Sequence, residues 1–411
     1  MQDQEGARTI TQKYDLFSLA FKANPFATFA RMRRDDPIYA HRSPDGSIIW
    51  YITRFEEVTA VLKDNDHFVK DVRNTLPPDA QKPRKSSLNR LINENMLFAD
   101  PPDHTRLRAL VNQAFTPRRV EQLAGRVQQI TNELLAAIAP DGEADLIASF
   151  ALPMPVRIIA ELLGIPPADQ AQVADWSQAI ISPGSRDLNY SARKRKVRAF
   201  VDYLRQMFAR RQREPQDDLI SALVQAEEAG ERLNEAELSS MVALLLVTGH
   251  ETTVNLLGNG ALALLNHSAQ LVILRERPGL WATAVEELLR FDGPVETSTT
   301  RWVRKDFIFQ GHQMQRGDVV RVVLASANRD ACQFAQPDVL DVTRRDNRHL
   351  AFGMGIHYCL GAPLARLEGQ IGLQTLFETF PNLRLAVPAN QLEWRSGVLF
   401  RGLKQLPVCL D

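Results

Sequence analysis

The sequence has 411 residues, of which 45% are hydrophobic and 24% charged, a composition that predicts a large packed core and excludes intrinsic disorder. Basic and acidic residues both number 49, so no overall field directs the chain to nucleic acid or to an anionic membrane. We expect a single domain over residues 1–411, since no Gly/Ser-rich, Pro-rich or charge-block linker divides the chain.

No targeting signal is evident near the start. Residues 1–5 are polar, and no charged and then apolar signal pattern follows them. The longest apolar run, around residues 241–247, is much shorter than the roughly 20 apolar residues that span a bilayer. We therefore expect a cytoplasmic protein without a membrane anchor. The 3 cysteines, an odd number, argue against a disulfide framework.

Two β-rich runs come first along the chain, residues 37–41 and 47–52, and the Asp45-Gly46 step between them predicts a hairpin. Residues 71–87 contain prolines and no periodicity, which predicts a long surface loop. Apolar residues then recur at helical spacing, and short β-like runs follow. The helical segments are residues 120–138, 154–163, 167–181, 192–211 and 219–229; the β-like runs are residues 307–309, 318–324 and 383–386. The fold class is therefore mainly α with small β-sheets.

One predicted helix is unusually long. Asn234 can cap its first turn while Glu237 reaches back in capping-box spacing, and the periodicity continues to about Leu265. Residues 242–247 are apolar on every face, so this part of the helix should be buried. Yet Thr-Gly-His-Glu-Thr-Thr follows at residues 248–253, and buried polar groups cost free energy unless they are paired. This polar run inside a buried helix indicates a function.

A second unusual segment is Phe-Gly-Met-Gly-Ile-His-Tyr-Cys-Leu-Gly at residues 352–361, just before a helix that opens at Ala362. Three glycines allow a tight loop whose backbone can approach a flat ligand. The helix N-terminus lowers the pKa of a nearby thiol, which favours the thiolate of Cys359. Two other readings remain open: Cys359 is a nucleophile with His357 as its base, or it is a buried structural cysteine.

Several motifs together resemble those of the cytochrome P450 family, and the resemblance covers nearly the whole chain. The glycine-rich loop around Cys359 is similar to the haem-binding signature, and residues 248–253 to the oxygen-activation motif of the long helix. Glu287-x-x-Arg290 resembles the Glu-x-x-Arg pair of a later helix. Residues 104–108 (His-Thr-Arg-Leu-Arg) resemble the haem-propionate segment of the family. Residues 327–330, together with Phe334, Pro337 and Asp338, resemble a segment found in its bacterial members. The implied fold is a triangular, helix-rich prism with the haem between the long helix and the helix after the cysteine loop.

The resemblance implies that Cys359 is the thiolate ligand of haem b (iron protoporphyrin IX), because a thiolate favours O–O cleavage. The haem propionates need positive donors, and His104 and Arg108 share one helix face. The implied cofactor-binding residues are Leu97, His104, Arg108, Gly249, Arg301, His349, Ala351, Phe352, Gly353, His357 and Gly361. Each histidine or arginine alone would be read as a surface or packing residue. Gly249 is expected where the helix backbone passes over the haem.

Catalysis is assigned to Glu251 and Thr252. Thr252 can hydrogen-bond the carbonyl of Thr248, hold dioxygen and organise water, while Glu251 relays the protons that oxygen cleavage requires. Thr248 stands where many relatives have alanine. Glu287 and Arg290, three apart on a helix, are interpreted as a structural ion pair. Removing one partner of such a buried pair costs about 3–5 kcal/mol of stability.

The implied reaction inserts one oxygen atom of O2 into a bulky hydrophobic substrate, by hydroxylation or epoxidation, and the motifs resemble the macrolide- and polyketide-oxidising branch. The expected substrate contacts are Leu88, Ile92, Leu244, Val247, Thr248, Val295, Thr297, Ser298 and Val398. Two alternatives are a haem-binding sensor or carrier without turnover and a peroxide-driven peroxygenase; the Glu251-Thr252 pair argues against both.

Electrons must come from outside the chain, because no flavin- or ferredoxin-like segment accompanies it. We expect a ferredoxin or flavodoxin with its NAD(P)H reductase, and a monomeric enzyme. A cationic docking face for such an acidic partner is predicted from arginines near the haem-side motifs. These are Arg106, Arg118, Arg119, Arg344, Arg345 and Arg348.

Overall fold

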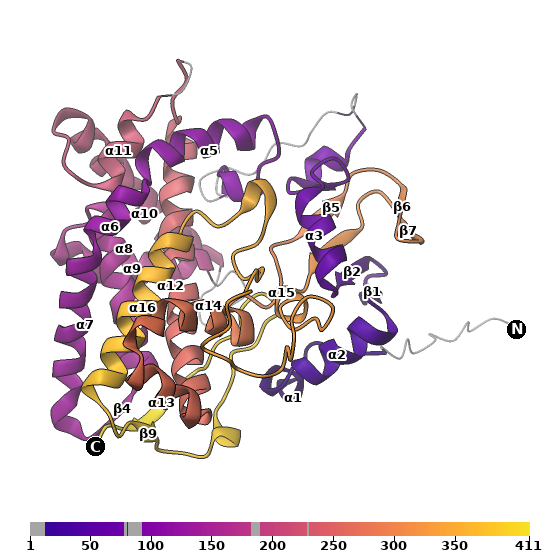
Figure 1. Ribbon diagram of the computed structural model, residues 1–411. Coiled ribbons are helices and arrows are strands. Elements are labelled where there is room, and N and C mark those ends of the chain that lie inside the picture. The colour runs from indigo at the N-terminus through magenta and orange to yellow at the C-terminus, as the bar shows by residue number, and fades with distance from the viewer. Residues whose placement is uncertain (1–12, 78–79, 81–92, 182–189, 228–229) are drawn as a thin grey trace, which may run out of the picture.

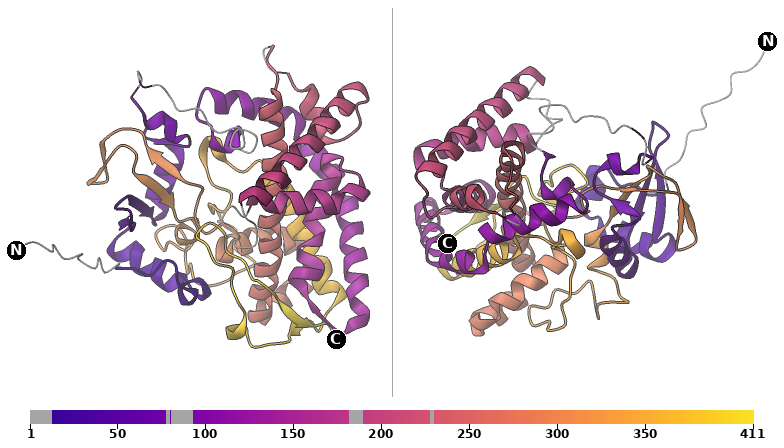
Figure 2. Two further views of the ribbon diagram at one scale, coloured as in Figure 1. Left: turned by 180° about the vertical axis from the view of Figure 1, so that it is seen from behind. Right: turned by 90° about the horizontal axis from the view of Figure 1, so that it is seen from above.

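Most helices and the larger sheet lie on different sides of the molecule. The computed structural model describes residues 13–77, 80, 93–181, 190–227 and 230–411. Most helices gather on the left of Figure 1 and most strands on its right, but the strands of residues 143–145 and 384–385 lie at its lower left, beside the helices. The view from above also places most helices to one side of the larger group of strands (Figure 2). The mainly α fold class with small sheets is confirmed.

The α-helices of the described residues are α1 (Leu19–Ala23), α2 (Phe26–Asp35), α3 (Phe55–Lys63), α5 (Asp103–Ala114), α6 (Pro117–Gln122), α7 (Ala124–Ile138), α8 (Pro153–Leu163), α9 (Pro167–Ile181), α10 (Tyr190–Arg213), α11 (Leu219–Gln225), α12 (Glu235–Asn266), α13 (Ser268–Glu276), α14 (Trp281–Asp292), α15 (Leu324–Ala327) and α16 (Ala362–Thr379). Short 3₁₀ turns are η1 (Val72–Thr75), η2 (Met96–Phe98), η3 (Ala139–Asp141), η5 (Pro278–Leu280), η6 (Gly355–His357) and η7 (Ala389–Gln391), and η4 (Ile147–Ala151) is a π-helix.

The strands are β1 (Ile38–Arg42), β2 (Ile48–Ile52), β3 (Phe68–Val69), β4 (Glu143–Asp145), β5 (Arg301–Val303), β6 (Phe307–Phe309), β7 (His312–Met314), β8 (Val319–Val322), β9 (Arg384–Leu385) and β10 (Pro407–Cys409). They form a sheet of order β1-β2-β8-β5-β3, a sheet of order β4-β10-β9 and the pair β6-β7. The predicted hairpin is present as β1 and β2, with Gly46 at φ +85° in its turn. Strands β2 and β8 pair in parallel, with Ile49 opposite Val319, although they lie far apart in the sequence.

Two helix predictions were wrong in extent. The segment 120–138 is divided between α6 and α7, because the N–H of Leu123 bonds the carbonyl of Val120, three residues back, in the tighter pattern that ends a helix. The segment 219–229 is helical only to Gln225, where α11 ends. Part of the predicted 71–87 loop is the turn η1, and much of the rest lies outside the described residues.

The long helix α12 begins as predicted. Asn234 accepts hydrogen bonds from the N–H groups of Ala236 and Glu237, and the Glu237 carboxylate accepts one from the Asn234 N–H, which completes the capping box. The helix is long and apolar enough to cross a membrane, but 67% of its most apolar stretch is buried inside the protein. It is therefore a core helix, packed against α8, α14 and α16.

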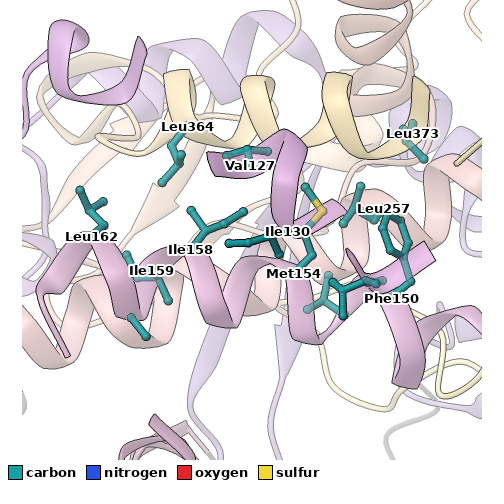
Figure 3. Packing of buried hydrophobic residues seen from close by; sticks show 14 of the residues in the cluster. Val127, Ile130, Phe150, Met154, Ile158, Ile159, Leu162, Leu257, Leu364 and Leu373 are labelled. Atoms are coloured by element: carbon teal, nitrogen blue, oxygen red, sulfur yellow. The ribbon is translucent and has the colours of Figure 1, made fainter. Parts of the chain in front are cut away.

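The core around α12 holds the cysteine-loop helix in place. Apolar side chains of α7, η4, α8, α12 and α16 interdigitate, among them Ile130, Ile158 and Leu373 (Figure 3). Gly369 and Gly372 of α16 allow close contact, since a Cβ at these positions would stand 2.9 and 2.8 Å from side-chain carbons of Leu256 and Leu257. This contact fixes α16, and with it the preceding loop, relative to the middle of α12.

Candidate active site

The cysteine loop is tight, and glycines make it so. Gly353 and Gly355 have φ of +71° and +76°, which side-chain-bearing residues rarely adopt. The N–H of Cys359 donates to the carbonyl of Phe352 at 3.0 Å and closes the loop. A Cβ at Gly355 would stand 2.6 Å from the carbonyl oxygen of Leu62, so the loop rests directly on the end of α3.

The side chain of Cys359 is accessible, yet it lies deep enough that burial raises the pKa of the thiol. The N–H groups of Gly361 and Ala362 and the Arg108 charge act in the opposite direction. The predicted lowering of the thiol pKa by the helix N-terminus is thus outweighed in the protein alone, and a thiolate here needs a further positive partner such as a metal ion.

The cysteine–histidine dyad is not formed. No hydrogen bond joins Cys359 to His357 among the described residues; instead the His357 ring lies edge-on to His104, with ring centroids 4.3 Å apart. Burial, reinforced by neighbouring cations, lowers the pKa of His357 to about 2. A histidine this hard to protonate is a poor general base.

Five basic side chains gather beside the cysteine loop. His104 and Arg108 come from α5, Arg301 from β5, His357 from the loop and Lys70 from the residue after β3. All but the half-buried Arg108 and His357 are buried. No sequence motif pointed to Lys70, whose ammonium donates to the carbonyls of Thr299 and Thr300 at 3.1 Å each.

This cluster carries uncompensated positive charge. Burial lowers the pKa of Lys70 well below its ordinary value and that of Arg301 to about 10. The negative charge of Asp100 acts to raise the pKa values of Lys70, His104 and Arg301, but burial outweighs it. Its oxygens already accept hydrogen bonds from the N–H of Lys70 and the amide of Asn74.

Two buried nitrogens in the cluster have no partner. The Nε2 atoms of His104 and His357 make no hydrogen bond among the described residues, although buried polar atoms are normally satisfied. Orphaned histidine nitrogens beside the Arg108 and Arg301 guanidinium groups suit a ligand that brings carboxylates. The residues therefore fit a ligand that brings two carboxylates to the cluster beside Cys359.

The other predicted cofactor residues surround the loop. Gly361 lies beside the sulfur, where an added Cβ would be 4.0 Å from Sγ. Phe352 packs under the Arg366 guanidinium, and Ala351 is buried against the helix α14. Leu97 is half-buried in η2.

His349 is engaged elsewhere. Its Nε2 lies 3.1 Å from the carboxylate of Glu286, and its Nδ1 accepts the N–H of Ala351 at 3.2 Å. The Glu286 carboxylate also accepts a hydrogen bond from Arg366. Burial acts to raise the pKa of the Glu286 carboxyl, but its two partners, His349 and Arg366, lower it to about 2. With both ring nitrogens occupied, His349 has no free donor for a cofactor, and the geometry assigns it to bracing α14 against the loop.

One face of α12 is accessible in its otherwise buried middle. Leu244, Val247, Thr248, Glu251 and Thr252 are half-buried, while 245, 246, 250 and 253 are buried. The spacing of three and four residues puts the accessible side chains on one helix face. The residues of this half-buried face are the predicted catalytic pair and three predicted substrate contacts.

The polar run on this face is mostly satisfied internally. Thr252 donates to the carbonyl of Thr248 at 2.9 Å, as its spacing predicts, and Thr248 donates to Leu244 at 2.7 Å. His250 bonds the carbonyl of Leu246 at 2.7 Å. Back-bonding to the preceding turn removes the cost of burial for these three side chains.

The reason given for Gly249 was wrong. A Cβ at this position would stand 3.1 Å from the side chain of Ile159, so the space that the glycine leaves is filled by α8. The glycine therefore permits helix packing rather than room for a ligand.

Glu251 is the exception in the polar run at residues 248–253. One carboxylate oxygen, Oε1, lies 3.7 Å from Nη1 of Arg395, and the other, Oε2, is buried and has no hydrogen-bond partner among the described residues. Burial raises the pKa of the Glu251 carboxyl, and the Arg395 charge opposes that rise. A carboxyl with a raised pKa is suited to carrying protons near neutral pH.

The remaining predicted substrate contacts lie on two adjoining segments. Val295 pairs with Phe400 in an isolated bridge, and Val398 is half-buried nearby. Thr297 is buried and donates to the carbonyl of Val398 at 2.8 Å, while Ser298 accepts Arg301 at 3.2 Å. These two hydroxyls are thus engaged within the protein. Leu88 and Ile92 lie outside the described residues.

Glu287 and Arg290 form a buried pair on α14. The guanidinium donates to both carboxylate oxygens at 2.7 and 2.8 Å, and neither side chain has exposed surface. Arg290 also donates to the carbonyls of Asn328, Pro337 and Val339. The pair therefore anchors the segment that leads to the cysteine loop.

The predicted cationic face is mostly neutralised. Arg106 pairs with Glu237, Arg119 with Asp217, Arg344 with Glu287 and Arg348 with Asp346. Arg118 and Arg345 form no ion pair among the described residues. Arg345 lines a surface hollow of about 550 Å³ beside α14 and α16, together with Glu286 and Arg366.

Comparisons with known proteins show which family this chain is similar to. The family model described as "Cytochrome P450" matches residues 279–400. "Polyketide biosynthesis cytochrome P450 PksS" of Bacillus subtilis is 45% identical over 95% of this chain and 97% of that protein. "Cytochrome P450 monooxygenase PikC" of Streptomyces venezuelae is 42% identical over 98% and 96%. The solved structure of PksS of the Bacillus subtilis bacillaene polyketide synthase superimposes with a TM-score of 0.90 at 43% identity, covering 97% of this chain and 100% of that one.

Proposed function

Because this chain belongs to the cytochrome P450 family, whose members bind haem b through a cysteine thiolate, we propose that Cys359 is the thiolate that holds the haem iron. The enzyme is a P450 monooxygenase, an oxidoreductase. The proposed reaction inserts one oxygen atom of O2 into a bulky hydrophobic substrate, by hydroxylation or epoxidation, with two electrons. When bound, the haem supplies the activation of O2 that no side chain can provide.

The haem propionates are assigned to the basic cluster. His104 and His357 have buried nitrogens without partners, and Arg108 and Arg301 carry positive charge beside them. Two carboxylates would satisfy the nitrogens and compensate the charges, which removes two separate costs of burial. Lys70, held by the Thr299 and Thr300 carbonyls, adds a further basic group near His357, and an anionic ligand would favour its charged form, which burial disfavours.

The main support for the proposed reaction is the accessible face of α12. It places a hydroxyl and a carboxyl side by side in a helix that is elsewhere sealed by apolar packing. Thr252, with its proton donated to Thr248, keeps its oxygen lone pairs free to order a water molecule. Glu251, whose pKa is raised by burial, takes protons from the solvent side and passes them toward Thr252.

The substrate is proposed to be a large apolar molecule. Leu244 and Val247 give the accessible face of α12 an apolar half, and the facing segment adds Val295 and Val398. Apolar lining with few polar groups suits a bulky hydrophobic ligand. The name of the relative PksS refers to polyketide biosynthesis, which supports a polyketide-like substrate.

The electrons are proposed to come from a separate ferredoxin or flavodoxin with its NAD(P)H reductase. Arg345 is a candidate contact, because it has no ion-pair partner among the described residues and lines the hollow between α14 and α16. We further propose that the protein works as a cytoplasmic monomer.

The decisive experiment is the absorbance of the reduced holoprotein under carbon monoxide. The wild-type protein should give the Soret band of a thiolate-ligated haem, and Cys359→Ser should lose it. Cys332→Ser, which removes another accessible cysteine, is the matched control and should keep the band. A histidine-type band in the wild type, or a thiolate-type band that survives in Cys359→Ser, would sink the assignment.

A further inference from the structure

A segment near the C-terminus crosses α12 beyond the proposed proton carrier. We call residues 394–403 the strap; it is part of the yellow chain that passes beside α12 in the view from behind (Figure 2). Trp394 and Leu403 pair in an isolated bridge, and the Arg395 N–H donates to the carbonyl of Gly402 at 2.8 Å. The strap is thus a closed loop and not a loose tail.

Arg401 anchors the strap to the body of the protein. Its guanidinium carbon lies 3.6 Å from the centre of the Trp394 ring, and its Nη1 donates to the carbonyl of Lys22 at 2.6 Å. Its Nε bonds the carboxylate of Asp292. A planar guanidinium that stacks and donates at once holds its surroundings rigidly.

Two asparagines of α12 hold the strap against the helix. The amide of Asn259 donates to the carbonyl of Arg401 at 3.0 Å. One turn earlier, Asn255 lies so close to Gly402 that a Cβ there would stand 1.9 Å from its Oδ1. The strap therefore contacts α12 one and two turns beyond Glu251, at a fixed distance.

From this base Arg395 reaches Glu251. Its Nε donates to the carbonyl of Leu403 at 3.3 Å, and its Nη1 lies 3.7 Å from Oε1 of Glu251. The Arg395 side chain is 39% exposed and that of Glu251 16% exposed, so the pair leads from solvent into the protein. Among the described residues, no other ion pair involves either side chain.

The remaining titratable neighbour is His250, on the same helix. It lies on the floor of a separate hollow of about 330 Å³ between α8, α9 and α12, and its Nδ1 bonds the carbonyl of Leu246. Burial lowers the pKa of His250 and the Arg395 charge lowers it further, although the hydrogen bond to Leu246 opposes this, so the neutral ring is favoured. Arg395 is therefore the positive charge that faces the Glu251 carboxylate.

We propose that Arg395 is a positioning residue, which holds the Glu251 carboxylate at the solvent side, where it takes up a proton from water before passing it toward Thr252. The inference rests on the proposed role of Glu251 as a proton carrier. A fixed cation keeps the carboxylate ionised between proton transfers and returns it to one place after each transfer. The contact of 3.7 Å is long enough for the protonated form to leave it readily.

The first test follows the Glu251 carboxyl directly. Infrared difference spectra of the resting holoprotein are recorded from about pH 4, near the ordinary pKa of a glutamate, to about pH 9. Subtracting the spectra of Glu251→Gln isolates the carboxyl band of Glu251. Arg395→Gln should move the Glu251 titration to higher pH, whereas Arg395→Lys should restore it toward the wild type. Lys404→Gln, which removes an exposed charge from the adjoining segment, is the control and should leave it unchanged.

The second test separates positioning from a structural effect. In Arg395→Gln, kcat for product formation should fall about tenfold with KM unchanged. The high-pH limb of the pH profile of kcat should shift to higher pH, together with the Glu251 titration. A Glu251 titration in Arg395→Gln that coincides with the wild type would overturn the proposal alone. If Glu251→Gln couples electrons to product as well as the wild type, the proposed proton carrier fails, and this inference fails with it.

Discussion

Gly402 of the strap and Asn255 of α12 are so close that a methyl group on the glycine would stand 1.9 Å from the asparagine Oδ1. Gly402→Ala must therefore push the strap off the helix, an overpacking that costs about 1–3 kcal/mol. Chemical denaturation should show this loss. Gly279→Ala, where an added Cβ meets nothing within 4 Å, is the matched control and should change stability little. Equal stabilities of the two variants would contradict the close contact.

The buried pair of α14 should be costly to break. Arg290→Gln leaves Glu287 without its main partner and three carbonyls without their donor, so we expect a loss of about 3–5 kcal/mol in the free energy of unfolding. Urea unfolding of the holoprotein measures it. Arg205→Gln breaks an exposed pair with Glu235 and should cost at most about 1 kcal/mol. The idea of a buried anchor is lost if the two variants are equally stable.

Glu368 of α16 gives a pH-dependent prediction. Its carboxyl is buried, and burial raises its pKa from 4.5 to about 8, although the nearby Thr253 hydroxyl opposes the rise. The folded state therefore holds a proton that the unfolded state releases between these values, and its stabilising effect, complete below pH 4.5, is lost as the pH rises toward 8.

Glu368→Gln removes this titration. The stability of the variant relative to the wild type should thus grow from pH 5 to pH 8, with a slope of at most about 1.4 kcal/mol per pH unit. Thermal unfolding at several pH values is sufficient to measure it. A difference that is constant with pH would show that Glu368 titrates in the folded protein as it does in the unfolded chain.

The role of Thr252 predicts a change in the products and not in binding. Thr252→Ala should keep the haem and the substrate-induced spectral shift but divert electrons to hydrogen peroxide, because the ordered water is lost. Thr252→Ser retains the hydroxyl and should remain largely coupled. Peroxide and product are measured per NADPH consumed. Unchanged coupling in Thr252→Ala would defeat the assignment.

The docking prediction concerns Arg345. Arg345→Glu should slow electron transfer from a plant-type [2Fe–2S] ferredoxin, and the difference from the wild type should shrink with added salt. Stopped-flow reduction under carbon monoxide reports the rate. Lys305→Glu reverses an exposed charge in the turn between β5 and β6 and serves as the control. Equal slowing by both variants would indicate a general charge effect without a local face.

Local signals in the sequence predicted local structure well. The capping box at Asn234 and Glu237, the hairpin turn at Gly46 and the helix that opens at Ala362 all depend on residues within a few positions of one another. The back-bond from Thr252 to Thr248 belongs to the same class, because helical geometry alone fixes it.

What sequence reasoning missed depends on contacts between distant segments. Lys70 joins the basic cluster only because β3 pairs with β5, and Arg395 meets Glu251 only because the strap is held on α12. Gly249 was assigned to the wrong neighbour because the approach of Ile159 from α8 leaves no trace in the local pattern. His349 likewise has Glu286 as its partner, 63 residues away.

The parallel pairing of β2 with β8 has a consequence for biosynthesis. Arg301 sits on β5, which pairs with β8, so the sheet that carries it is complete only when residues 319–322 meet residues 49–52. Cys359 is made later still, and α16, which fixes its loop on α12, ends only at Thr379. A nascent chain that ends before Thr379 therefore lacks part of the support for the cysteine loop, although it can already contain the basic cluster. If the proposed cofactor site is right, haem capture follows translation of most of the chain, and a product truncated before residue 359 cannot form the iron–sulfur bond.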